Sequence, residues 1–139
     1  MKETVLLYNI NNKNTRSIIQ LIAVQMKIRV RTITPSQYHM PLGLLAFGKP
    51  EDQKEYLTDD PAGFDDAMLV FAGISGTRLH AFLAQMAKKR VPKIDLKASL
   101  TEHNAVWDSV TLHEELVKEH ASLHGGDLST AEHSDTAEE

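Results

Sequence analysis

The chain has 139 residues, of which 42% are hydrophobic and 24% charged, a composition typical of one soluble globular domain, and no apolar run approaches the ~18 residues that span a bilayer. It contains no cysteine, which excludes disulfides, thiolate nucleophiles and thiolate metal sites. Five of the 19 acidic residues lie in Ser122–Glu139, so the other 14 nearly balance the 15 lysines and arginines, and no overall positive charge points to nucleic acid.

The first half of the chain predicts a strand, a helix and a second strand. Thr4–Ile10 is a nearly unbroken apolar run, as in a strand buried on both faces. A helical stripe follows, with Asn12 or Asn14 as its cap. Ile28–Ile33 alternates between apolar residues and arginines, which is typical of a half-exposed strand.

The second half repeats the pattern and adds a helix. Ala67–Gly73 is another continuous apolar run, and the segment from Ser75 to Arg90 is the clearest amphipathic helix in the chain. Lys93–Leu100 alternates strictly, with Asp95, Lys97 and Ser99 on one face. A last helix is expected over roughly residues 106–121, with Trp107 as an apolar anchor.

The order of these elements predicts an α/β fold. Helices between strands indicate right-handed parallel crossovers. Continuous apolar runs belong in the middle of a sheet and alternating runs at its edges. We therefore expect a small doubly wound parallel sheet of about four strands in the order 2-1-3-4, with helices on both faces. A split βαβ sandwich of the α+β class, with antiparallel pairs, is the alternative.

A long link and a polar tail complete the chain. Within the link, Thr34–Phe47 is too apolar to lie free in water, whereas residues 48–66 hold seven acids and read as a mobile surface loop. The tail, Ser122–Glu139, is acidic with little apolar content. We expect one domain over residues 1–121 and a disordered acidic tail over 122–139. The N-terminus has no recognisable secretory signal, which favours a cytoplasmic location.

Candidate ligand-binding residues follow from the expected sheet. Ligands of open parallel sheets bind at the carboxyl ends of strands, near the point where the strand order reverses. The loops there read "NINN" (9–12), "GISG" (73–76) and, after the fourth strand, "TEHN" (101–104). The candidates are Asn9, Asn11, Gly73, Ser75, Gly76, Thr101, His103 and Asn104.

Each of these loops also has a purely structural explanation. "GISG" precedes a helix and could bind an anion, but there is no phosphate-loop motif, and Ser75 can simply cap the helix. Thr101 or Asn104 can cap the last helix, while His103 could act as a base near neutral pH. We expect the "TEHN" stretch to be chiefly a strand-to-helix junction.

Histidines and cations do not assemble into an evident site. His120 and His124 are four residues apart on one helical face, and His113 lies seven residues before His120. The pattern fixes no carboxylate beside them. We expect solvated histidines and no metal site. We also predict no cofactor, because strand 1 is followed by neither a carboxylate nor a Gly-rich phosphate loop.

Three pieces of the sequence resemble a known family. They read "KIRVRTI", "PLGLLAF" and "IDLKASLTEHNAVW…LHEELVKEH". Together they resemble the bacterial domain of unknown function family 3783 over about residues 4–120. The resemblance implies a small bacterial, cytoplasmic protein and carries no activity with it.

The sequence favours a small non-catalytic binding or regulatory module over an enzyme, because no nucleophile, base and acid are grouped. The alternative is an enzyme with a small-molecule or nucleotide pocket at the carboxyl ends of strands 1, 3 and 4. The expected partner is a small molecule or a protein. A membrane or nucleic-acid partner is not expected, and the oligomeric state is open.

Overall fold

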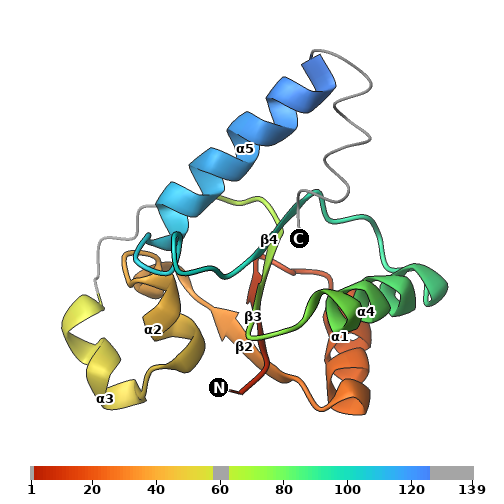
Figure 1. The fold of residues 1–139 in the computed structure, drawn as a ribbon, viewed down its shortest axis with the longest axis horizontal. Coiled ribbons are helices and arrows are strands. Elements are labelled where there is room, and N and C mark those ends of the chain that lie inside the picture. Colours follow the sequence, from red (N-terminus) through yellow and green to blue (C-terminus); the bar gives the residue numbers. More distant parts are fainter. Residues whose placement is uncertain (1, 58–62, 126–139) are drawn as a thin grey trace.

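The chain folds into a four-stranded sheet between two layers of helices, in a computed structural model that describes residues 2–57 and 63–125 (Figure 1). In chain order the elements are β1 (Thr4–Tyr8), α1 (Lys13–Met26), β2 (Arg29–Ile33), the 3-10 turn η1 (Pro35–Gln37), α2 (Leu42–Phe47), α3 (Pro50–Gln53), the 3-10 turn η2 (Lys54–Tyr56), β3 (Met68–Ala72), α4 (Gly76–Lys88), β4 (Leu96–Ser99) and α5 (Ser109–Gly125).

The strand order is β2-β1-β3-β4, as the burial pattern predicts. Every residue of β1 and β3 is buried, which suits the two central strands, whereas β4 alternates between buried and half-buried residues. The strands β1 and β2 run parallel, and so do β3 and β4. The α/β class, the order and the presence of helices on both faces are thus confirmed.

The direction of β3 differs from the expectation. It runs antiparallel to β1, with Tyr8 opposite Met68 and Thr4 opposite Ala72, so the sheet is mixed and not wholly parallel. The physical reason is that an apolar run buried on both faces satisfies a central strand in either direction. The connection from β2 to β3, which contains α2 and α3, sets the direction instead.

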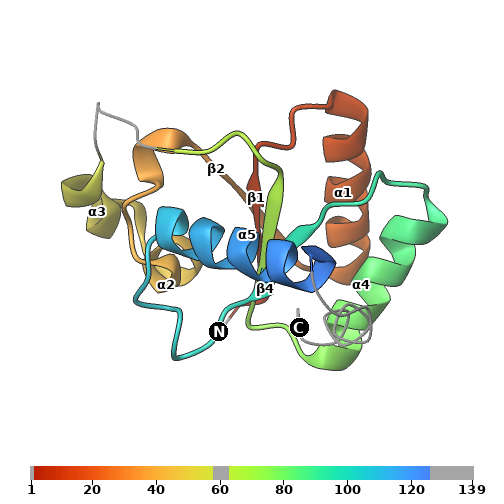
Figure 2. The same ribbon diagram turned by 90° about the horizontal axis from the view of Figure 1, so that it is seen from above.

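Each face of the sheet has its own hydrophobic core. On one face, α1 and α4 pack against β1 and β3 through residues such as Ile19, Ile22 and Phe82. On the other face, α2, η1 and α5 cover Leu6, Tyr8, Leu96 and further sheet residues. Figure 2 shows α5 lying across the β4 side of the molecule, with α1 and α4 in the other layer.

The two arginines of β2 are bound to α2 and do not contribute to a continuous positively charged surface. The guanidinium of Arg29 donates to the carbonyl of Ala46, and that of Arg31 donates to the carbonyls of Leu45 and Gly48. These carbonyls belong to the C-terminal end of α2, where cations are favoured. Both arginines therefore serve the fold.

The link and the end of the domain differ in part from the expectation. Leu42 and Leu45 are buried, so the apolar part of the link is ordered as expected. Residues 50–56, expected to be a mobile loop, form α3 and η2, and residues 58–62 lie outside the described part. Helix α5 continues to Gly125, past the expected boundary at residue 121, and the rest of the expected tail lies outside the described residues.

No helix in the described ranges is both long and apolar enough to cross a membrane.

Candidate functional site

Because β3 runs antiparallel to β1, the predicted site residues lie at two opposite ends of the strands. Because Tyr8 pairs with Met68, the loop after β1 lies beside the start of β3 and not beside its end. Asn9 and Asn11 therefore lie at one end of the strands, while Gly73 and the loop after β4 lie at the opposite end. The premise that all these loops share one edge was wrong, so the eight candidates do not line a single pocket.

Asn9 holds two loops together. Its backbone has a positive φ of 56°, and its side-chain amide donates to the carbonyls of Phe64 and Asp66 at 2.9 and 3.0 Å. These bonds fasten the end of β1 to the segment that enters β3. Asn11 is exposed, and its neighbour Asn12 caps α1 by accepting from the backbone N–H of Thr15.

The "GISG" loop is a turn from a strand into a helix. Gly73 has a φ of 72°, a left-handed conformation that favours glycine, and Ser75 caps α4 by accepting from the N–H of Arg78. Gly76 is the first residue of α4 and is exposed. The loop therefore has the geometry of a strand-to-helix turn with Ser75 as the helix cap. Ligand binding there stays a prediction.

The "TEHN" stretch folds into a turn of its own. The backbone N–H of Thr101 donates to Asn104 Oδ1 at 2.8 Å, and the N–H of Asn104 donates to Thr101 Oγ1 at 3.1 Å. We expected Thr101 or Asn104 to cap the last helix, but neither residue caps α5. That helix begins at Ser109, and Asp108 accepts from the N–H of Thr111 at 2.8 Å. The stretch is thus a strand-to-helix junction, as predicted, with a different cap.

A hollow of about 190 Å³ lies beside this turn, between the loop, β4 and α5. His103 meets the half-buried Trp107 edge to face, with ring centroids 5.2 Å apart. Three of the predicted site residues, Thr101, His103 and Asn104, line this hollow. The other lining residues are Lys97, Ala98, Ser99, Trp107, Leu112, Glu115, Leu116 and Glu119.

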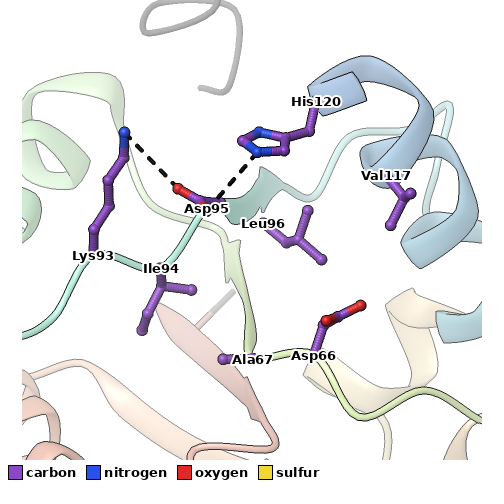
Figure 3. A pocket seen from close by; sticks show the side chains of 8 residues that line it. All are labelled: Asp66, Ala67, Lys93, Ile94, Asp95, Leu96, Val117 and His120. Carbon is purple, nitrogen blue, oxygen red and sulfur yellow. Dashed lines mark ion pairs between the residues drawn. The ribbon is translucent and has the colours of Figure 1, made fainter. Parts of the chain in front are cut away.

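A larger hollow of about 340 Å³ lies at the beginning of β4 (Figure 3). Apolar side chains, including Leu96 and Val117, form part of its wall, and charged groups surround them. Asp95 lies between two basic side chains, with Lys93 Nζ at 3.8 Å and His120 Nε2 at 3.9 Å. The full lining is Asp66, Ala67, Lys93, Ile94, Asp95, Leu96, Val117 and His120.

Together the two hollows follow the edge of the sheet. Residues 93–96 line one and residues 97–99 line the other, without a gap between them. Successive residues of a strand point to opposite faces. A hollow lined by consecutive residues must therefore lie beside the strand. We call the combined surface, made by residues 93–99 with Glu115, Leu116, Val117, Glu119 and His120 of α5, the β4 groove.

The backbone of β4 is directed into this groove at alternate residues. The N–H of Leu100 donates to Phe71 in β3, whereas the carbonyl of Ser99 accepts from Asn104 on the outer side. In a parallel pair the N–H and C=O of one residue face the same neighbour, and the direction alternates along the strand. Within β4, Lys97 and Ser99 accordingly direct their backbone groups away from β3.

The charged side chains at the groove are exposed and held in weak pairs. The side chains of Lys93, Asp95 and His120 are 76, 48 and 38% exposed, and exposed pairs of this kind contribute ~0–1 kcal/mol. Lys97 Nζ donates to the carbonyl of Ile94 at 2.7 Å. The Lys93–Asp95 pair can therefore open at little cost when another chain or a ligand arrives.

Other polar side chains serve the fold on the α5 side. His113 Nε2 lies 2.8 Å from Asp66 Oδ2, and its ring stacks on Phe64 with centroids 4.0 Å apart. The expectation of a solvated histidine is wrong for His113, whose side chain is 16% exposed. Tyr8 and the buried Ser109 share a hydrogen bond of 2.7 Å between hydroxyls, which fastens the start of α5 to the sheet.

Metal binding finds no support in the geometry. Within residues 2–57 and 63–125, no three histidine or carboxylate side chains are close enough to hold an ion. The side chain of His124 is not among those described.

Comparison with known proteins bears on the second half of the chain. The segment from β3 to the last turns of α5 contains both hollows except for Asp66. Residues 67–123 match the family model described as a domain of unknown function, DUF3783. The resemblance of "IDLKASLTEHNAVW…LHEELVKEH" to DUF3783 is thereby confirmed, whereas "KIRVRTI" and "PLGLLAF" fall outside the matched residues. No curated protein and no solved structure matches the chain significantly.

The segment that matches the DUF3783 model therefore carries the groove almost by itself. Sequence reasoning placed three of the lining residues there, through the "TEHN" loop. It missed Lys93, Asp95 and Lys97 as site residues because they look like the solvent face of an edge strand, and it missed Glu115 and Val117 because they look like the surface of a helix. The useful signal was the strict alternation of Lys93–Leu100, which marks an edge strand.

Proposed function

We propose that the protein is a non-catalytic interaction module that binds an extended polypeptide segment in the β4 groove. The observation that carries the proposal is the unbroken run of residues 93–99 along two adjoining hollows at the edge of the sheet. A strand added there would hydrogen-bond to the backbone of Lys97 and to the N–H of Ser99, whose carbonyl already accepts from Asn104. Its side chains would lie in the hollows, so that the backbone gives affinity and the side chains give specificity.

The charges beside the groove define the kind of segment that fits. In an antiparallel pair, residues opposite one another interact directly, and opposite charges stabilise the pair. A partner running antiparallel to β4 would place an acid opposite Lys97. The preferred segment thus carries an acidic residue at that position. The shortness of β4, four residues, and its lysine limit indiscriminate pairing.

A peptide selection tests this proposal. A display library of random, unstructured peptides is selected against the protein, and the enriched peptides are titrated while backbone amide resonances are followed. The largest changes are expected at Lys97 and Ser99, with an acidic residue common among the enriched peptides.

Two variants at one position isolate the backbone contribution. Lys97→Pro removes an N–H that faces away from β3, which an edge strand tolerates, and Lys97→Ala keeps it while removing the same side chain. Peptide affinity should fall at least about tenfold more for the proline variant, as two ladder hydrogen bonds are disturbed. Equal affinity for both folded variants, or resonance changes elsewhere on the molecule, would overturn the proposal.

The larger hollow supports a second candidate, an enzyme or small-molecule site. Its volume of about 340 Å³ reaches the lower range for small-ligand pockets, and an imidazole and a carboxylate face each other there at 3.9 Å. A thermal-shift screen with nucleotides and phosphosugars separates the two candidates. Stabilisation by such a compound that is lost in His120→Ala would favour the small-molecule site.

We further propose that the protein is bacterial and works in the cytoplasm. The support is the likeness to DUF3783 and the absence of cysteine, which suits a reducing compartment. Fractionation of cells that produce the tagged protein would test the location.

A further inference from the structure

We infer that the hollow of about 190 Å³ beside Trp107 is a specificity pocket of the β4 groove and takes a lysine or arginine side chain of the bound segment. The inference rests on the proposed function and names the chemistry of its partner. The basic residue stands directly before the acidic residue that lies opposite Lys97. The partner is thus an extended segment in which a base is followed at once by an acid.

The two faces of β4 offer such a segment different contacts. Lys97 pairs with Leu69 of β3, which belongs to the core under α1 and α4, so its side chain is on that face. Ala98 pairs with Val70, which belongs to the core on the α5 face. Residues opposite one another in an antiparallel pair share a face. The segment residue opposite Ala98 therefore faces α5 and comes directly before the residue opposite Lys97.

On the α5 face, one stripe of the helix borders the hollow. Its members have helical spacing and therefore share one side of α5; they are Leu112, Glu115, Leu116 and Glu119. Leu112 is buried, Glu115 and Leu116 are half-buried, and Glu119 is exposed. The half-buried Trp107 also lines the hollow. The hollow is therefore apolar in its most covered part and carries a carboxylate where it opens to water.

A long basic side chain suits both parts of this hollow. Lysine and arginine lay an aliphatic stem along apolar surface while the charged head stays in water. A cation over the indole ring of Trp107 would gain a further attraction. Glu115 and Glu119 place negative charge where the head arrives, and hydrogen bonds between opposite charges are stronger than neutral ones.

The cations nearby leave room for this head. The ammonium of Lys97 donates to the carbonyl of Ile94, ahead of β4, whereas the hollow lies toward the end of that strand. Lys118 Nζ lies 3.4 Å from Glu115 Oε2, with side chains 75 and 45% exposed. Exposed pairs of this kind open at little cost.

The order of charges in selected peptides tests the register. Peptides enriched on the native protein should carry lysine or arginine directly before the acid, since a segment in the opposite orientation would carry the base after it. In the leading peptide, norleucine in place of the base keeps the aliphatic stem and removes the charge. Its affinity should fall at least about threefold.

Variants of α5 connect the base with its carboxylates. Glu115→Gln and Glu119→Gln should each weaken the lysine or arginine peptide at least about twofold and leave the norleucine peptide unchanged. Glu114→Gln is the matched control, because Glu114 is an exposed acid of the same helix outside the hollow. Trp107 is the only tryptophan of the chain, so its emission should change when a tryptophan-free peptide binds.

The two proposals fail separately. Peptides that bind at Lys97 and Ser99 without a base before the acid, or that lose equal affinity with and without the base in Glu115→Gln and Glu119→Gln, would overturn the specificity pocket and leave the interaction module standing. Bound peptides that leave the emission of Trp107 unchanged would overturn the pocket too. A selection in which no peptide affects the resonances of Lys97 or Ser99 would overturn both proposals.

Discussion

The hydroxyl of Tyr38 is a buried polar group without a hydrogen-bond partner in the part of the chain that the structure describes. Its ring stacks on Phe64 with centroids 4.7 Å apart, a contact that phenylalanine would keep. Tyr38→Phe should therefore leave the free energy of unfolding in urea unchanged or raise it by about 1 kcal/mol, because an unpaired buried polar group is removed. Tyr8→Phe, which breaks the bond to Ser109, should lower it by about 1 kcal/mol. Equal losses in both variants would show that the Tyr38 hydroxyl has a partner.

Tyr8 also predicts a sensitivity to alkali. Burial raises the pKa of its hydroxyl well above the ordinary value, and the Ser109 hydrogen bond opposes this only in part. Below about pH 10 both the folded and the unfolded chain hold the proton, so the contribution of Tyr8 to stability is complete. Above about pH 10 the unfolded chain ionises first, and the folded state loses about 1.4 kcal/mol per pH unit. The native chain should therefore keep its stability advantage over Tyr8→Phe up to about pH 10 and lose it between about pH 10 and about pH 11. A constant difference would contradict the raised pKa.

At the scale of elements, the loop after β4 joins α5 to α2. The N–H groups of Leu42 and Gly43, unpaired within the first turn of α2, donate to the carbonyls of Trp107 and Ala105 at 2.8 and 2.9 Å. The ring of Trp107 packs against the core that α2 and α5 share. Trp107→Ala should cost roughly 3 kcal/mol of unfolding free energy. His103→Ala, at an exposed neighbour, should cost little. A mild effect at Trp107 would mean that the carbonyl contacts alone hold the junction.

The strands and helices also show how far the sequence predicts the fold. The continuous runs Thr4–Ile10 and Ala67–Gly73 identify the central strands, and the alternating runs identify the edges, because burial on one or two faces leaves a direct trace in residue type. The direction of β3 leaves no such trace. The same apolar side chains suit a parallel or an antiparallel neighbour. Asn9 and Gly73 were predicted to lie at the same end of the strands, but they lie at opposite ends.

The candidate site was predictable only in part. The "TEHN" loop could be found because polar residues follow a strand, and His103 does line a hollow. Lys97 and Ser99 are also plain in the sequence. Their importance depends on which backbone groups of β4 face β3, and this becomes known only from the register of the two strands.

At the scale of the whole molecule, the fold has two unlike edges. The β2 edge lies near α2, and both of its arginines are engaged with the carbonyls of that helix. The β4 edge lies beside two hollows, where Lys97 and Ser99 direct their backbone groups away from β3. A peptide strand paired there would turn an exposed edge into an interior one, which removes the hazard of unselective aggregation.

Hydrogen exchange at single amides of β4 tests the central claim most directly. The N–H groups of Leu96 and Ala98 face β3 and should be protected with or without peptide. Those of Lys97 and Ser99 face the groove, so their exchange should slow as a selected peptide is added, in step with the fraction bound. Exchange at Lys97 and Ser99 that stays the same under saturating peptide would contradict the account.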